Sequence, residues 1–144
     1  MQNIKKLIIG LLVLGYSICF SQWSTDPAEN TRISNYGLGP FITTDGNGGG
    51  IIAWHDDYYY IDIVAQRIDS AGYLKWSANC IPICRAKLDQ SINDIVSDGS
   101  GGAYIAWTDH RFSVAPETGY QDSASVYIQH INSAGEILWQ ENGI

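Results

Sequence analysis

The sequence predicts an all-β protein made of two four-stranded antiparallel units. The composition is the first indication: glycine is abundant, at 15 residues, aromatic residues make up 12%, and only 16% of the residues are charged. Such a composition is typical of short strands joined by tight turns. The second indication is an internal repeat of about 50 residues, and the third is the turn chemistry at fixed places in each copy of that repeat.

The repeat is visible as two matched blocks. Residues 45–56 return as residues 98–109 at an offset of 53, with eight of the twelve positions identical. Residues 66–72 return as residues 129–135 at an offset of 63, and Trp76 then matches Trp139. The second copy therefore carries ten extra residues between its blocks. We expect two units, at about residues 24–76 and 77–139.

Each unit is predicted to contain four strands. In the second unit we expect three strands at about Ser91–Ser97, Ala103–Thr108 and Ser125–Asn132, and a fourth ending at Trp139. The Asp-Gly and neighbouring glycines between the first two strands supply the positive φ that a tight hairpin needs. The first unit follows the same plan with a shorter middle loop, His55–Tyr60, and its fourth strand ends at Trp76.

Repeated four-stranded units of this length are the signature of β-propeller blades. A β-sandwich is disfavoured, because it does not require two halves of such similar sequence. Trp23 lies 22 residues before Asp45, as Trp76 lies before Asp98, so Trp23 corresponds to the end of a further unit. The chain stops at Ile144, where a third unit would begin. We therefore expect a fragment of a larger β-propeller, incomplete as a folding unit.

The motifs also resemble a known family. The pattern Asp-Gly-x-Gly-Gly-x-x-x-Ala-Trp-x-Asp, followed by a Gln-containing strand, Ser-Ala-Gly and Trp, resembles the propeller-type repeats of large secreted bacterial proteins. Many of these are exported by type IX secretion, and the resemblance implies an extracellular location. The chain departs from that pattern at Cys80, where a glycine is expected, and in having no C-terminal sorting domain.

The N-terminus predicts export. Lys5 and Lys6 precede an apolar run from Leu7 to Leu14, and Ser21 provides a small residue before a cut. This order is that of a secretory signal peptide, residues 1–21, and the apolar run is too short to span a membrane. We expect a secreted or cell-surface protein with no membrane span after cleavage.

The charge of the mature chain excludes one class of partner. Cleavage removes two basic residues, so six remain against 15 acidic ones, and the net charge changes from −7 to −9. An acidic chain repels phosphate backbones, so nucleic acid is not an expected partner.

The cysteine and acidic motifs predict no metal site and no cofactor. Two cysteines remain in the mature chain, Cys80 and Cys84. A turn at Pro82 would allow a disulfide between them, and two partly buried thiols are the alternative. The residues from Asp45 to Asp56 partly match a calcium-binding EF-hand loop, but ligand positions are missing. A structural hairpin is favoured, with Asp45 and Asp98 bonding the backbone of their turns.

The candidate binding residues are those that do not recur between the units. They lie in the two middle loops, where variable residues on a rigid frame commonly carry function. Adjacent tyrosines with nearby histidines suit a planar or sugar-like ligand, and packing against a neighbouring sheet is the alternative. The partner would be a cell-surface glycan or a protein. The candidate residues are His55, Asp57, Tyr58, Tyr59, Tyr60, His110 and Arg111.

These observations favour a non-catalytic exported protein with a binding or scaffolding role. Residues such as Asp56 and Asp109 recur in both units, whereas an active site occurs once per ring. Two alternatives remain open at this point. In the first alternative, the chain is the N-terminal part of a secreted propeller enzyme, such as a glycosidase or lyase. In the second, it is a truncated reading frame without function.

The signal peptide makes a direct prediction. Cleavage between Ser21 and Gln22 is expected during export, because the preceding residues have the charge and hydropathy order that signal peptidase substrates share. N-terminal sequencing or intact-mass measurement of secreted protein will test the position. Recovery of the uncleaved chain from the cytoplasm would contradict it.

Overall fold

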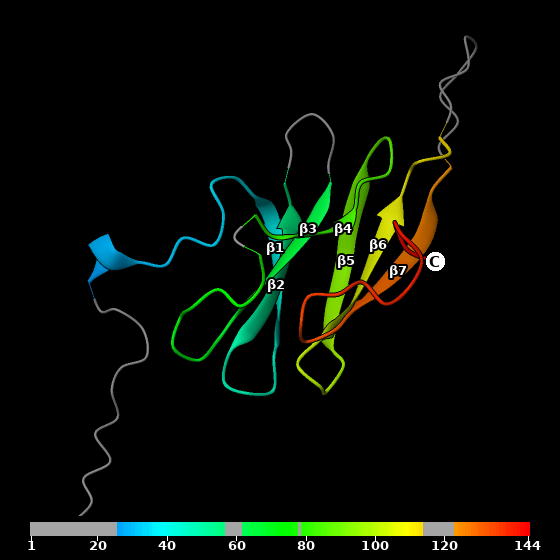
Figure 1. The fold of residues 1–144 in the computed structure, drawn as a ribbon. Helices are drawn as coiled ribbons and strands as arrows, with labels where there is room; N and C mark the ends of the chain where they lie inside the picture. Colours follow the sequence, from blue (N-terminus) through cyan, green and yellow to red (C-terminus); the bar gives the residue numbers. More distant parts are fainter. Residues whose placement is uncertain (1–25, 57–61, 78, 114–122) are drawn as a thin grey trace, which may run out of the picture.

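The computed structural model describes residues 26–56, 62–77, 79–113 and 123–144. These residues form two antiparallel sheets (Figure 1), which confirms the all-β prediction. The first sheet has the order β1-β2-β3-β4, and the second has the order β5-β6-β7. A short 3-10 helix, η1, precedes the sheets. The bounds are η1 Pro27–Glu29, β1 Leu38–Thr44, β2 Gly50–His55, β3 Ile63–Ile68, β4 Ile81–Cys84, β5 Gln90–Ser97, β6 Ala103–Asp109 and β7 Ser125–Ile131.

The two glycine-rich hairpins are built alike. Asp45 Oδ1 accepts hydrogen bonds from the backbone amides of Asn47 and Gly49, at 2.8 Å each. Asp98 Oδ1 accepts in the same way from Ser100 and Gly102. The expectation that these aspartates bond the turn backbone is confirmed. The turn is compact enough that a Cβ atom on Gly102 would lie 2.3 Å from the carbonyl oxygen of Ile131.

The predicted fourth strands, ending at Trp76 and Trp139, are wrong. After β3 and β7 the chain turns back and makes only an isolated bridge, Ile68 with Leu74 or Ile131 with Ile137. The physical reason is a buried glutamine in each sheet, Gln66 or Gln129. The Gln66 amide accepts from the Trp76 backbone and donates to the Ser77 carbonyl. A side chain thus takes the place of a backbone ladder.

Gln129 makes the same pair of bonds in the second sheet. Its amide accepts from the Trp139 backbone at 3.2 Å and donates to the Gln140 carbonyl at 2.8 Å. Both glutamines are fully buried. The same contact therefore holds the return segment at corresponding positions of the two sheets.

The actual fourth strand of the first sheet is β4, which follows Trp76 and was assigned from sequence to the second unit. The chain reaches it through a turn at Cys80, whose φ of 63° is left-handed. Its counterpart Gly143 has a φ of 86°. Ile144 then exchanges two backbone hydrogen bonds with Ile128, in the register that Ile81 has with Ala65.

The main core lies between the two sheets. It contains the inward-facing residues of β2 and β3 and those of β5 and β6, with Trp76 and Trp107 among them. Strand β6 shows the alternation of a sheet with one covered face, because Ala103, Ile105 and Trp107 are buried and Tyr104 is only half-buried. The two sheets thus pack face to face through their apolar sides.

The other face of each sheet is covered differently. On the first sheet Ile52, Trp54, Val64 and Ile68 form a smaller cluster with Ile33, so residues of the 31–37 segment cover part of it. The indole of Trp54 donates to the carbonyl of Tyr36. On the second sheet Val126 is 78% exposed.

Hydrogen bonds join the sheets along β5. The Ser97 backbone donates to Thr43 Oγ1 at 3.2 Å, and the Ile92 backbone donates to His55 Nε2 at 3.1 Å. At the far edge Arg67 and Trp76 both donate to the carbonyl oxygen of Ser133, at 3.0 and 3.1 Å. The relation between the sheets is therefore held by polar contacts as well as by the core.

Within the described ranges, the helical structure includes nothing that has both the length and the apolar character needed to cross a bilayer.

The glutamine contact makes a testable prediction. Replacing Gln66 by Leu removes the acceptor for the buried Trp76 amide, and an unsatisfied buried donor costs about 1–3 kcal/mol. We expect the free energy of unfolding to fall by that amount in chemical denaturation. Gln140→Leu is the matched control, because the Gln140 side chain is exposed, and its effect should stay within about 0.5 kcal/mol. Equal effects of the two variants would contradict the assignment.

Candidate functional site

The strands that flank the two middle connections end on the same side of the sheets (Figure 1). The β2–β3 pair ends with His55 opposite Ile63, and the β6–β7 pair ends with Asp109 opposite Ser125. The glycine-rich hairpins lie at the other end, where Thr44 pairs with Gly50 and Ser97 with Ala103. Of the candidate binding residues, His55, His110 and Arg111 are in the described chain. Asp57, Tyr58, Tyr59 and Tyr60 lie outside the described residues.

His55 lies in the contact between the sheets. As the last residue of β2 it accepts a hydrogen bond from the Ile92 backbone through Nε2. Accepting at Nε2 requires the neutral tautomer with its proton on Nδ1. Burial lowers the pKa of His55 below its ordinary value of 6.5, because desolvation disfavours the imidazolium. The neutral ring therefore serves as a connection between the sheets.

Arg111 binds residues of the second sheet and of the segment that follows it. Its guanidinium binds both carboxylate oxygens of Asp109, at 2.8 and 2.6 Å, and donates to the carbonyl of Asn142 at 2.8 Å. The guanidinium carbon lies 3.9 Å from the centre of the Tyr127 ring, in a cation–π contact. Only 15% of its side chain is exposed. Arg111 thus ties the start of the second middle connection to the return segment.

Asp109 is the centre of this cluster. Burial raises its pKa, but hydrogen bonds from Arg111 and from the Trp107 indole outweigh burial, so that the pKa lies below its ordinary value. The carboxylate is therefore ionised and paired. The neighbouring Cys84 thiol is 3.8 Å from Asp109 Oδ2. Burial raises the pKa of Cys84 to about 11, so this thiol is unreactive near neutral pH.

The remaining described candidate is His110, which follows β6. Its backbone donates to the carbonyl of Asp89 and its carbonyl accepts from Ser113, so it begins a turn that leads into the second middle connection. The structure therefore brings His55 and Arg111 into two separate internal networks. Each is held at the base of a middle connection.

The cysteines and acidic groups of the described chain form neither a disulfide nor a metal-binding group. Cys80 and Cys84 are free thiols in the structure, which decides between the two alternatives left by the sequence. In the ranges described, no three His, Cys, Asp or Glu side chains gather into a group suited to a metal ion.

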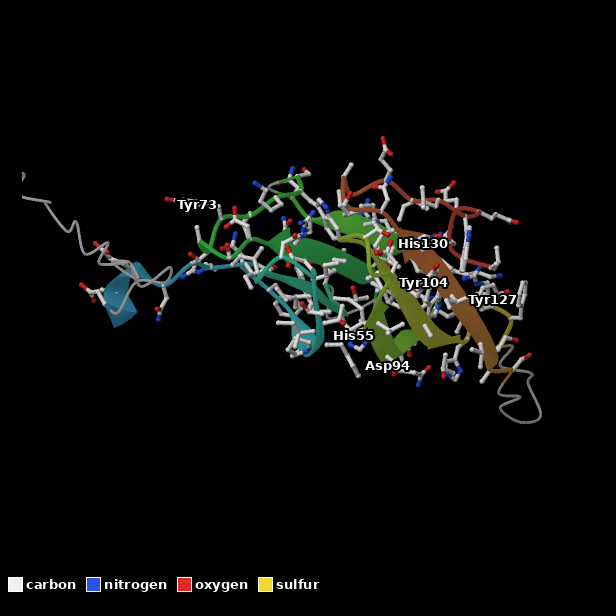
Figure 2. The ribbon with its side chains drawn as sticks, turned by 90° about the horizontal axis from the view of Figure 1, so that it is seen from below. His55, Tyr73, Asp94, Tyr104, Tyr127 and His130 are labelled. Carbon is white, nitrogen blue, oxygen red and sulfur yellow. The ribbon has the colours of Figure 1, made fainter. Side chains whose placement is uncertain are left out.

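One group of aromatic residues was missed by the sequence reasoning. Tyr104 of β6 and His130 of β7 stack with ring centres 4.2 Å apart, and Trp139 lies 5.7 Å from each of them. Figure 2 shows His130 and Tyr104 next to each other on the second sheet, far from Tyr73. The match between Trp139 and Trp76 was visible in the sequence, but which side of the sheet it occupies was not.

Compared with known protein families, with curated proteins and with solved structures, this chain has no match.

The His55 contact predicts a pH dependence. The folded pKa is depressed, so the unfolded chain binds a proton more readily, and the free energy of unfolding should fall as the pH drops below about 6.5. His55→Gln, whose amide oxygen can accept from Ile92, should reduce this slope between pH 7 and pH 5. Urea unfolding at a series of pH values measures it. His110→Gln is the control, and identical pH profiles for wild type and His55→Gln would exclude the assignment.

Proposed function

We propose that this chain is an exported, non-catalytic β-propeller-like protein that binds a glycan or protein outside the cytoplasm. Its binding surface is formed by the two middle connections, which include Asp57, Tyr58, Tyr59, Tyr60 and His110, while His55 and Arg111 hold the bases of these connections in place.

The observation that carries the proposal is the shared end of the two sheets. The connection after His55 and the connection after Asp109 both leave that end, and β5 bonds directly to β1 and β2. Two neighbouring loops on one rigid frame suit a shared ligand. The three tyrosines of the first loop add amphipathic rings, which stack on sugar faces and donate hydrogen bonds.

The propeller-like character is supported by matched contacts in the two sheets. In both, a buried glutamine holds the return segment, and an aspartate caps the glycine-rich hairpin. The sheets also stack in sequence order, with the inner face of one on the inner face of the next. Antiparallel sheets stacked in this way are the building units of propellers.

A role in binding rather than catalysis is supported by how the charged groups are used. Asp45 binds Arg67, Asp109 binds Arg111, and each pair is buried or nearly so. Catalytic groups need a reachable substrate and a pKa tuned to transfer a proton. Here the lowered pKa values of Asp45 and Asp109 belong to carboxylates that hold turns and strands together.

The proposal is tested by binding measurements on the secreted chain. A Tyr58→Ala, Tyr59→Ala, Tyr60→Ala triple variant should lose affinity for cell-surface polysaccharide by about tenfold or more, equivalent to about 1.4 kcal/mol. Glycan-array binding followed by calorimetry measures it. Tyr73→Ala is the matched control, because Tyr73 is 70% exposed and lies on the turn that follows β3. Loss of binding in the control alone, or no binding by wild type to glycan or surface protein, would overturn the proposal.

A further inference from the structure

The junction between the two sheets has a defined corner. On the first sheet Arg67 reaches Asp45 and also donates to the carbonyl of Ser133 in the second sheet. Trp76 donates to the same carbonyl, and a Cβ atom on Gly135 would lie only 2.9 Å from its ring. The Ser133–Gly135 turn is therefore seated between a cation and an indole.

The second sheet carries the same corner on its opposite, outer face. His130 occupies the position of Arg67 and bonds to Asp98 at 2.9 Å, as Arg67 bonds to Asp45. Trp139 occupies the position of Trp76 and is fixed by Gln129, as Trp76 is by Gln66. Corresponding backbone and side-chain contacts thus aim an indole and an imidazole outward.

No other sheet of the described chain lies on this outer face. Trp76 is 7% exposed because it is covered by the second sheet, whereas Trp139 is only half-buried and Val126 is 78% exposed. The stacked Tyr104 and His130 rings lie beside Trp139. The face carries exposed apolar side chains together with the His130 imidazole. The corresponding face of the first sheet is covered by the second sheet.

The first sheet offers the complementary seat. Its turn Ser70-Ala71-Gly72 has the sequence of Ser133-Ala134-Gly135, and Asp69 caps it as Asn132 caps the other. The Thr31 hydroxyl bonds to the carbonyl of Gly72. The carbonyl of Ser70 is the counterpart of the Ser133 acceptor. Among the described residues, none donates a hydrogen bond to it.

The surface beside that turn is also open. Ile42 of β1 is 70% exposed, whereas its counterpart Ile95 of β5 is 6% exposed because the first sheet covers it. A pocket of about 360 Å³ lies here, lined by Ile42, Ile68 and the glycines of the hairpin. The 31–37 segment covers the Trp54 side of this face and leaves the Ile42 side free.

We propose that the outer face of the second sheet, built on Tyr104, His130 and Trp139, docks onto the Ile42 and Ser70–Gly72 side of the first sheet of a second copy. The contact would repeat between molecules the junction that joins the two sheets within one. Because the two surfaces differ, association is head to tail, and it continues into chains or closes into a ring. It goes beyond the proposed ligand site, which lies at the end of the middle connections.

The test is the association of residues 22–144, measured by sedimentation velocity over a range of concentrations. Wild type should associate reversibly. Trp139→Ala and Ile42→Lys should each weaken association by about tenfold or more, since they alter opposite sides of one contact. His130→Arg should strengthen it, because it restores the guanidinium that Arg67 uses to hold Asp45 and Ser133 together. Phe112→Ala is the control and should associate as wild type does, because Phe112 is 62% exposed and follows β6 at the end of the sheets away from the Ser70–Gly72 turn.

A mixing experiment separates head-to-tail docking from other packing. Trp139→Ala retains a good receiving side and Ile42→Lys retains a good docking face, so a mixture of the two should form dimers that neither forms alone. The proposal would be overturned if wild type and His130→Arg both stay monomeric. Normal association of the Ile42→Lys variant would also overturn it. That result would mean that two copies meet through the outer faces of their second sheets, without the first sheet. Circular dichroism checks that each variant is folded, and the tyrosine-loop variant should associate normally whatever its ligand binding.

Discussion

The carbonyl oxygen of Ser133 accepts hydrogen bonds from Arg67 and Trp76, which belong to the other sheet. This contact closes one edge of the apolar layer between the sheets, which buries Ile51, Ile105 and their neighbours completely. A sheet with one apolar face needs a second layer to cover it, and a hairpin without one is marginally stable. The strand register, the hairpins and the position of the middle connections all depend on this packing.

The polar groups follow from the same constraint. Burial raises the pKa of Asp45, Asp98 and Asp109, yet hydrogen bonds from backbone amides and from neighbouring side chains lower it further than burial raises it. The partners are Arg67, His130 and Arg111. Carboxylates held in this way stabilise the fold above the pKa range of the unfolded chain and lose that effect as they are protonated in acid. The buried carboxylates of this protein therefore serve mainly to hold strands and turns together.

Much of the fold was predictable because its signals are local. The glycine-rich hairpins and the strands around them follow from turn chemistry and from alternation, and β5, β6 and β7 agree with their predicted positions to within a residue. The fourth strand was not predictable, because a buried glutamine side chain replaces the expected ladder after β3 and β7. Nothing in the local sequence distinguishes a glutamine that points to solvent from one that binds the returning chain.

The candidate site shows the same division. By itself the sequence determined where the loops fall, which residues differ between the units, and the correspondence of Trp76 with Trp139, because these depend on order along the chain. Only the tertiary structure decided that His55 bonds to Ile92 and that Arg111 bonds to Asp109. It also decided that Trp76 is covered while Trp139 is not. Matched positions of the repeat differ in burial because burial depends on what lies across the sheet, and the position of the neighbouring sheet is a property of the folded chain.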